Sequence, residues 1–119
     1  MTESHDPHQI AGTYILAAED DQIARLVLKK ILEQAGYRSH FVADGREAID
    51  ALKLMDYDLV LMDCIMPRLD GFAATRLIRN AKTGDINPDI PVIAMTGLSG
   101  EANRRRCLDA GMDDHIAKP

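Results

Sequence analysis

Short apolar runs recur along the chain and are separated by longer segments of mixed polarity. Runs of three to five residues with few polar positions are typical of strands that are buried on both faces in a parallel sheet. Such runs occupy 14–18, 59–62, 91–95 and 115–117, and another short candidate strand lies near 38–43. The pattern therefore predicts five strands.

The segments between these runs have helical periodicity, which predicts helices over about 21–35, 45–55, 71–81 and 100–110. The alternation of strand and helix predicts an α/β fold in which right-handed crossovers form a three-layer sandwich. We expect one such domain over 13–119.

Cap residues and apolar stripes refine the helices. Asp21 is a candidate N-cap, and Gly36 and Gly111 are candidate stops. The apolar residues expected to face the core are Ile23, Leu26, Val27, Ile31 and Leu32 in the first helix, Ala48, Leu52 and Met55 in the second, and Phe72, Leu77 and Ile78 in the third.

The composition limits the classes of function. With 119 residues, 46% of them hydrophobic, the chain can bury a core, and its net charge of -5 argues against a nucleic-acid surface. Arg104, Arg105 and Arg106 are interpreted as a solvated helix face. No apolar run spans a bilayer, so a cytoplasmic location without membrane contact is expected, and Cys64 and Cys107 are interpreted as packing residues. The polar segment 1–12 is interpreted as a flexible tail or linker.

Polar residues follow the predicted strands at their carboxyl ends. They are the pair Glu19 and Asp20, then Asp63, Thr96 and Lys118. In open α/β sheets the ligand crevice lies beyond this edge, so these side chains are expected to converge. Each alone has an ordinary alternative as a helix cap or a turn residue, and only the four positions together, in order, indicate a site.

These pieces resemble the receiver domain of two-component response regulators. The resemblance covers about 13–119 and rests on Glu19-Asp20, the segment Leu61–Gly71, the triplet Met95–Gly97 and the segment Gly111–Pro119. It implies a flavodoxin-like sheet in 2-1-3-4-5 order. It also implies a signalling domain that is not an enzyme in the usual sense, within a pathway of bacterial type.

The resemblance implies a role for each site residue. Asp63 would be the phosphoacceptor, and Mg²⁺ would be held by Asp20, Asp63, Glu19 through water, and the main-chain carbonyl of Ile65. Lys118 and Thr96 would hold phosphoryl oxygens, because positive charge and hydroxyl donors stabilise a transferred phosphoryl group. The donor would be a histidine kinase, a histidine-phosphotransfer domain or a small phosphodonor.

Three departures from the family pattern carry their own expectations. His115 stands where an aromatic switch residue is usual, which resembles the receivers of hybrid histidine kinases. Ile65 and Leu98 cannot position a water, so slow self-dephosphorylation is expected. The sequence stops at Pro119, before the usual fifth helix, so Ile116 and its neighbours are expected to be exposed. Such a patch makes a homodimer possible, but a chain that continues beyond this sequence is the favoured explanation.

Partner surfaces and rival functions are also open at this stage. Gln22, Ile23 and Pro119 are expected to surround a docking phosphotransfer helix, and the face with Arg104, Arg105 and His115 is the alternative.

A phosphohydrolase of the haloacid dehalogenase type is disfavoured, because it needs an acid where this chain has Ile65. A receiver-like interaction module that is never phosphorylated remains as the second alternative.

Overall fold

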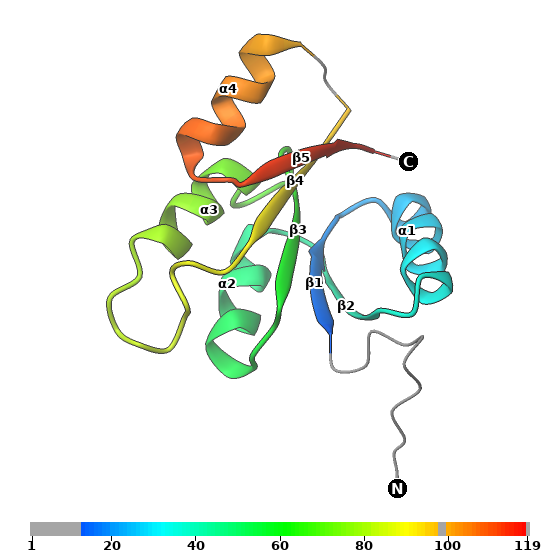
Figure 1. Cartoon of the computed structure of the whole chain (residues 1–119), viewed down its shortest axis with the longest axis horizontal. Helices are drawn as coiled ribbons and strands as arrows, with labels where there is room; N and C mark the ends of the chain where they lie inside the picture. The colour runs from blue at the N-terminus through cyan, green and yellow to red at the C-terminus, as the bar shows by residue number, and fades with distance from the viewer. Residues whose placement is uncertain (1–12, 98–99, 119) are drawn as a thin grey trace, which may run out of the picture.

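The computed structural model describes residues 13–97 and 100–118, where strands and helices alternate as predicted (Figure 1). The strands are β1 (Tyr14–Ala18), β2 (Arg38–Val42), β3 (Leu59–Asp63), β4 (Val92–Thr96) and β5 (Asp114–Ala117). The helices are α1 (Gln22–Gln34), α2 (Gly45–Leu54), α3 (Gly71–Arg79) and α4 (Glu101–Ala110). The predicted tail over 1–12, Leu98 and Pro119 lie outside the described residues.

The five strands are parallel and lie in the order β2-β1-β3-β4-β5. The helices α2, α3 and α4 lie on one side of the sheet and α1 lies on the other (Figure 1). This confirms the predicted three-layer α/β fold and its strand order. Because all strands run the same way, the residues that end β1, β3 and β4 share one edge of the sheet.

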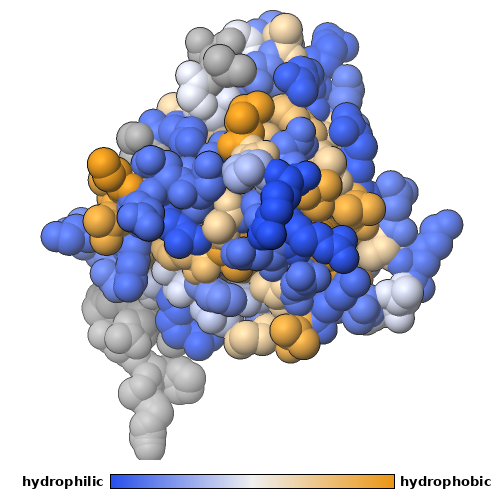
Figure 2. All heavy atoms as spheres, turned by 180° about the vertical axis from the view of Figure 1, so that it is seen from behind, coloured by the Kyte–Doolittle hydropathy of each residue, from blue (hydrophilic) through white to orange (hydrophobic). Residues whose placement is uncertain are grey.

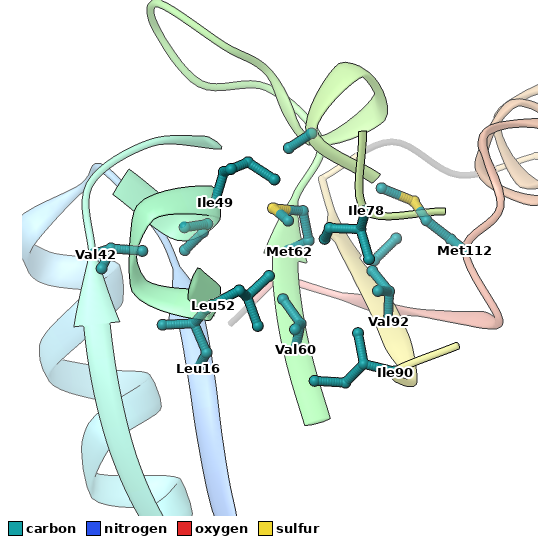
Figure 3. Packing of buried hydrophobic residues seen from close by; sticks show 14 of the residues in the cluster. Leu16, Val42, Ile49, Leu52, Val60, Met62, Ile78, Ile90, Val92 and Met112 are labelled. Carbon is teal, nitrogen blue, oxygen red and sulfur yellow. The ribbon is translucent and has the colours of Figure 1, made fainter. Parts of the chain in front are cut away.

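The larger core lies between the sheet and the helices α2 and α3 (Figure 3). Strand side chains such as Leu16, Val60 and Val92 pack there against Leu52 and Ile78. Each such side chain contributes about 1.5–3 kcal/mol of burial free energy, so the strands that carry the predicted site have firm positions.

Helix α1 buries a narrower stripe than the sequence predicts. Leu28 and Leu32 face the second core cluster, whereas Ile23 is 73% exposed and Leu26 is 67% exposed. Figure 2 shows apolar side chains at the edge of the molecule formed by α1. The prediction is therefore confirmed for Leu32 and wrong for the other four residues, since Val27 and Ile31 are exposed as well, and Leu28 was not predicted. A helix that packs on one sheet face buries only part of its circumference, and periodicity does not say which part.

Two further apolar predictions are wrong for similar reasons. Met55 and Leu77 are exposed, whereas Ala48, Leu52, Phe72 and Ile78 are buried as expected. Met55 follows the last residue of α2 and has an extended backbone, so it leaves the helical stripe. Leu77 precedes Ile78 in α3, and a rotation of about 100° per residue carries it away from the core.

The predicted helix ends are confirmed. The Asp21 carboxylate accepts a hydrogen bond from the Ala24 amide at 2.8 Å. Gly36 follows the C-cap of α1 with a φ of 89°, and the Tyr37 amide donates to the Leu32 carbonyl at 3.0 Å. Gly111 ends α4 with a φ of 101°. Positive φ favours glycine, which explains both stops.

Gly71 lets α3 begin against the end of β3. A Cβ atom at Gly71 would lie 2.1 Å from the carbonyl oxygen of Asp63, so only glycine fits. The Asp70 carboxylate caps the same helix by accepting from the Ala73 amide at 2.8 Å. These two features set the path of the chain directly after Asp63.

The side of the sheet that carries α1 has an apolar surface. Ile116 of β5 is 42% exposed there, which confirms the sequence-based expectation for this residue. Self-association through this surface stays a prediction. None of the helices in 13–97 and 100–118 is long and apolar enough to cross a membrane.

Candidate functional site

Three carboxylates converge where β1 and β3 end. Glu19 and Asp20 follow β1, Asp63 ends β3, and one oxygen atom of each lies within 4.8 Å of the others. Glu19 and Asp63 are buried, whereas Asp20 is exposed. Carboxylate oxygens at one partly open point are the ligands that Mg²⁺ takes in proteins, usually together with waters. The donor set therefore fits a hard divalent cation.

The ammonium of Lys118 pairs with two carboxylates of this cluster. Its Nζ lies 2.9 Å from Asp63 Oδ2 and 3.2 Å from Glu19 Oε1. The Lys118 amide also donates to the Thr96 carbonyl at 3.0 Å, which ties this residue to the end of β4. Burial alone would lower the pKa of Lys118, but its hydrogen bonds to Asp63 and Glu19 and their charges outweigh burial and raise it. Lys118 is therefore a fixed positive charge.

The buried carboxyl of Glu19 has a raised pKa. Burial raises the pKa of its carboxyl, and the charge of Asp63 adds to that effect. The Asp21 amide, which donates to Glu19 Oε2 at 3.0 Å, and Lys118 oppose the shift without cancelling it. A divalent cation would offset this repulsion between carboxylates.

Thr96 and His115 make their described side-chain contacts away from the carboxylates. Thr96 is buried, and its hydroxyl oxygen Oγ1 accepts a hydrogen bond from Asn103 Nδ2 at 3.2 Å. His115 is exposed, and its Nδ1 lies 3.9 Å from a carboxylate oxygen of Asp114. The structure thus brings Glu19, Asp20, Asp63 and Lys118 together, and it places Thr96 toward α4.

The loop after Asp63 is anchored by an ion pair that sequence reasoning missed. Arg68 has a φ of 65°, and its guanidinium binds the buried carboxylate of Asp44, which also caps α2. The Gly45 amide donates to the Leu69 carbonyl at 2.9 Å. Burial alone would raise the pKa of Asp44, but the Glu47 amide and Arg68 outweigh it and hold the pKa below its usual value. This loop includes Ile65, whose amide donates to Asp63 Oδ1 at 3.3 Å.

Asn103 is a second contact that sequence reasoning missed. It shares the buried stripe of α4 with Cys107 and Ala110, at helical spacing. A polar residue on an otherwise apolar stripe was the available signal, because buried polar groups need a partner.

A sequence model of the response regulator receiver domain matches residues 15–119. Among curated relatives, hybrid signal transduction histidine kinase B of Dictyostelium discoideum is 35% identical over 113 residues, covering 88% of this chain and 6% of the relative. Transcription factor SKN7 of Saccharomyces cerevisiae is 39% identical over 108 residues, covering 91% of this chain and 17% of the relative. The chain therefore spans only a small part of these two proteins.

Solved structures show the same likeness. The receiver domain of sensor histidine kinase PA1611 from Pseudomonas aeruginosa, described with a magnesium ion in its active-site cleft, is 41% identical with a TM-score of 0.80. The match covers 92% of this chain and 87% of that one. The receiver domain of Francisella response regulator 1452 is 30% identical with a TM-score of 0.81, covering 91% of this chain and 85% of that one.

Proposed function

The chain belongs to the response regulator receiver family, and from that premise we propose that it accepts a phosphoryl group on Asp63 in a Mg²⁺-dependent reaction and changes conformation in response. The donor is the phosphohistidine of a histidine kinase or of a histidine-phosphotransfer domain. The observation that carries the proposal is the convergence of Glu19, Asp20 and Asp63 within 4.8 Å, with Lys118 Nζ 2.9 Å from Asp63 Oδ2.

The reaction transfers the phosphoryl group from nitrogen to oxygen. A carboxylate oxygen of Asp63 forms a bond to phosphorus while the phosphorus–nitrogen bond of the donor breaks, and the imidazole nitrogen keeps the bonding electron pair. The main obstacle is repulsion between an anionic acceptor and an anionic phosphoryl group. A site for this reaction therefore needs concentrated positive charge beside its carboxylates.

The described carboxylates and Lys118 meet this need in two ways. Asp20 and Asp63, with Glu19 through water and the Ile65 carbonyl, would hold Mg²⁺, which neutralises charge on the phosphoryl oxygens when bound. Lys118 supplies a compact positive charge from the opposite side, where it pairs with Asp63 at rest. After transfer, the same ammonium would pair with a phosphoryl oxygen.

The conformational response begins at Thr96. Its hydroxyl would donate to a phosphoryl oxygen, which draws the Thr96 side chain toward Asp63 and shifts the elements that contact it. His115 lies on the neighbouring strand, at the position of the family's aromatic switch residue, and is expected to take part in this shift. The exposed surface near α4 and β5 would then differ between the two states.

A donor histidine must reach Asp63 from the open side of the site. Gln22 and Ile23, in the first turn of α1, are exposed beside Glu19 and Asp20 and provide a polar and an apolar contact for a partner helix. Ile65, two residues after Asp63, is also apolar and is 62% exposed. Exposed apolar side chains beside a polar site suit a partner that docks through apolar contacts while it presents a phosphohistidine.

The first test is the intact mass of the protein after incubation with acetyl phosphate, with and without Mg²⁺. The expected result is a gain of one phosphoryl group that requires Mg²⁺ and is absent from Asp63→Asn. Asp58→Asn, an exposed acid at the other end of β3, is the matched control and should gain the group like the wild type. A folded wild-type protein that gains no mass would favour the unphosphorylated interaction module.

A further inference from the structure

Asn103 links the first turn of α4 to the end of β4. Its amide nitrogen Nδ2 lies 3.2 Å from Thr96 Oγ1, and both side chains are buried, with Asn103 only 8% exposed. A hydrogen bond between buried polar groups is shielded from water, so it cannot be replaced at little cost by a bond to solvent. This bond therefore restrains both the Thr96 side chain and the first turn of α4.

The two ends of α4 are held by different contacts. Cys107 and Ala110 are buried in its second half, and the guanidinium carbon of Arg106 lies 4.2 Å from the centre of the Phe72 ring. In the first half Asn103 is the buried side chain, and Gly100 offers no side-chain cap. Within the described residues, the attachment of the first turn to β4 thus depends strongly on Asn103.

Strand alternation places Thr96 and Asp63 on different sides of the sheet. Val92 and Ala94 of β4 belong to the core on the α2 and α3 side, so Thr96, two residues after Ala94, follows them to that side. Asp63 lies two residues after Leu61, which belongs to the cluster on the α1 side, so alternation places Asp63 on the α1 side. The Thr96 hydroxyl must therefore turn away from Asn103 to reach a phosphoryl group on Asp63.

Resting on the function proposed above, we propose that the hydrogen bond between Asn103 and Thr96 is a latch that holds α4 in its resting position until Asp63 is phosphorylated. The phosphoryl oxygen competes with Asn103 for the Thr96 side chain. When Thr96 turns, the first turn of α4 loses this attachment to β4. Asn103 is thus a positioning residue that sets how readily the domain enters its phosphorylated conformation.

Removing the latch should favour the phosphorylated conformation. Because a hydrogen bond of this kind changes an equilibrium by roughly two- to tenfold, Asn103→Ala should gain the phosphoryl group from acetyl phosphate and Mg²⁺ faster by that factor. The matched control is Asn80→Ala, which removes an exposed amide that donates to the Arg76 carbonyl. Its rate should equal that of the wild type.

A second pair of variants separates the latch from a general effect on folding. In a Thr96→Ala background, Asn103→Ala should not change the rate, because the hydroxyl through which it acts is gone. The latch is wrong if Asn103→Ala is no faster than the wild type, or if it accelerates the reaction equally without the Thr96 hydroxyl. Asn103→Leu, which fills the space of the amide, replaces the alanine variant if a melting curve shows that alanine unfolds the domain.

Hydrogen exchange of the α4 amides gives an independent readout. In the wild type, exchange over 101–110 should rise on phosphorylation, whereas in Asn103→Ala it should be high beforehand and change little. Exchange that rises equally in both proteins overturns the latch and leaves the proposed function intact. A wild type that gains no phosphoryl group overturns the proposed function as well, so the two failures are distinguishable.

Discussion

Lys118 Nζ lies 2.9 Å from Asp63 Oδ2, although the two residues are 55 positions apart in the chain. The pairing arises because β3 and β5 both run parallel to β4, so their carboxyl ends meet at one edge. The same ammonium lies 3.2 Å from Glu19. The Lys118 ammonium therefore balances the charge of two buried carboxylates.

Lys118→Ala should bind Mg²⁺ more tightly but accept a phosphoryl group more slowly. Removal of the ammonium leaves Asp63 and Glu19 more negative, which should tighten binding by up to about tenfold for a partly exposed charge. Phosphoryl transfer should slow because the developing charge loses a partner. Calorimetric Mg²⁺ titration and intact-mass kinetics measure the two effects. Lys53→Ala, at the exposed end of α2, is the control and should behave like the wild type. If the Mg²⁺ affinity and the transfer rate of Lys118→Ala both rose or both fell, the role assigned to Lys118 would be wrong.

Ile65→Asn should shorten the lifetime of the phosphorylated protein several-fold. The Ile65 side chain is exposed and apolar beside Asp63, so it offers no group to orient an attacking water. An amide at this position would hold a water near phosphorus. The measurement is the loss of the phosphoryl group by intact mass after the donor is removed. Ile65→Leu keeps the apolar character and should decay like the wild type. Equal decay of all three proteins would show that this position does not limit hydrolysis.

Protonation of the Asp44 carboxylate in acid should make the domain less stable. Its pKa is lowered in the folded protein by the Glu47 amide and Arg68, so its stabilising contribution is present above the unfolded pKa of about 4 and is lost as pH falls through the lower folded value. Asp44→Asn should therefore lose less free energy of unfolding than the wild type between about pH 5 and about pH 3. Denaturant unfolding across this interval tests the prediction. Asp50→Asn, an exposed acid of α2, should follow the wild type.

Arg79 should be important for the stability of the fold and unimportant for phosphorylation of Asp63. At the end of α3 its guanidinium donates to the carbonyls of Pro88, Ile90 and Gly111 at 2.6–2.9 Å. Arg79→Ala leaves those carbonyls without this donor and should reduce the free energy of unfolding by about 2 kcal/mol. Denaturant unfolding measures the loss, and Arg76→Ala, exposed in the same turn, should cost much less. A large loss of phosphorylation in folded Arg79→Ala would contradict a purely structural role.

Local sequence signals were sufficient for the elements and for most of their ends. The apolar runs predicted β1, β3 and β4, because central strands covered on both faces need apolar residues at most positions. The edge strands β2 and β5 were also predicted, although β2 carries polar residues and β5 is exposed. Asp21, Gly36 and Gly111 marked helix ends because capping and positive φ depend on the residue itself. The convergence of Glu19, Asp20, Asp63 and Lys118 was also predictable, since parallel strands place their carboxyl ends on one edge.

The burial of particular helix faces was not predictable to the same degree. Ile23 and Leu26 have the same apolar character as Leu28 and Leu32, yet only the latter two are buried. Which stripe faces the sheet depends on how α1 rotates and crosses the strands, and that orientation depends on the whole set of core contacts. Leu77 was misassigned for the same reason, because a stripe in the sequence carries no direction.

The sequence by itself determined the strands, the helix caps and the acidic edge of the sheet, because those depend on neighbouring residues and on one rule of parallel topology. Only the tertiary structure decided which side chains meet outside that edge. The bond from Asn103 to Thr96 and the ion pair from Arg68 to Asp44 belong to this class. Each needs two elements to be packed at a definite distance and angle, and no local pattern encodes that geometry.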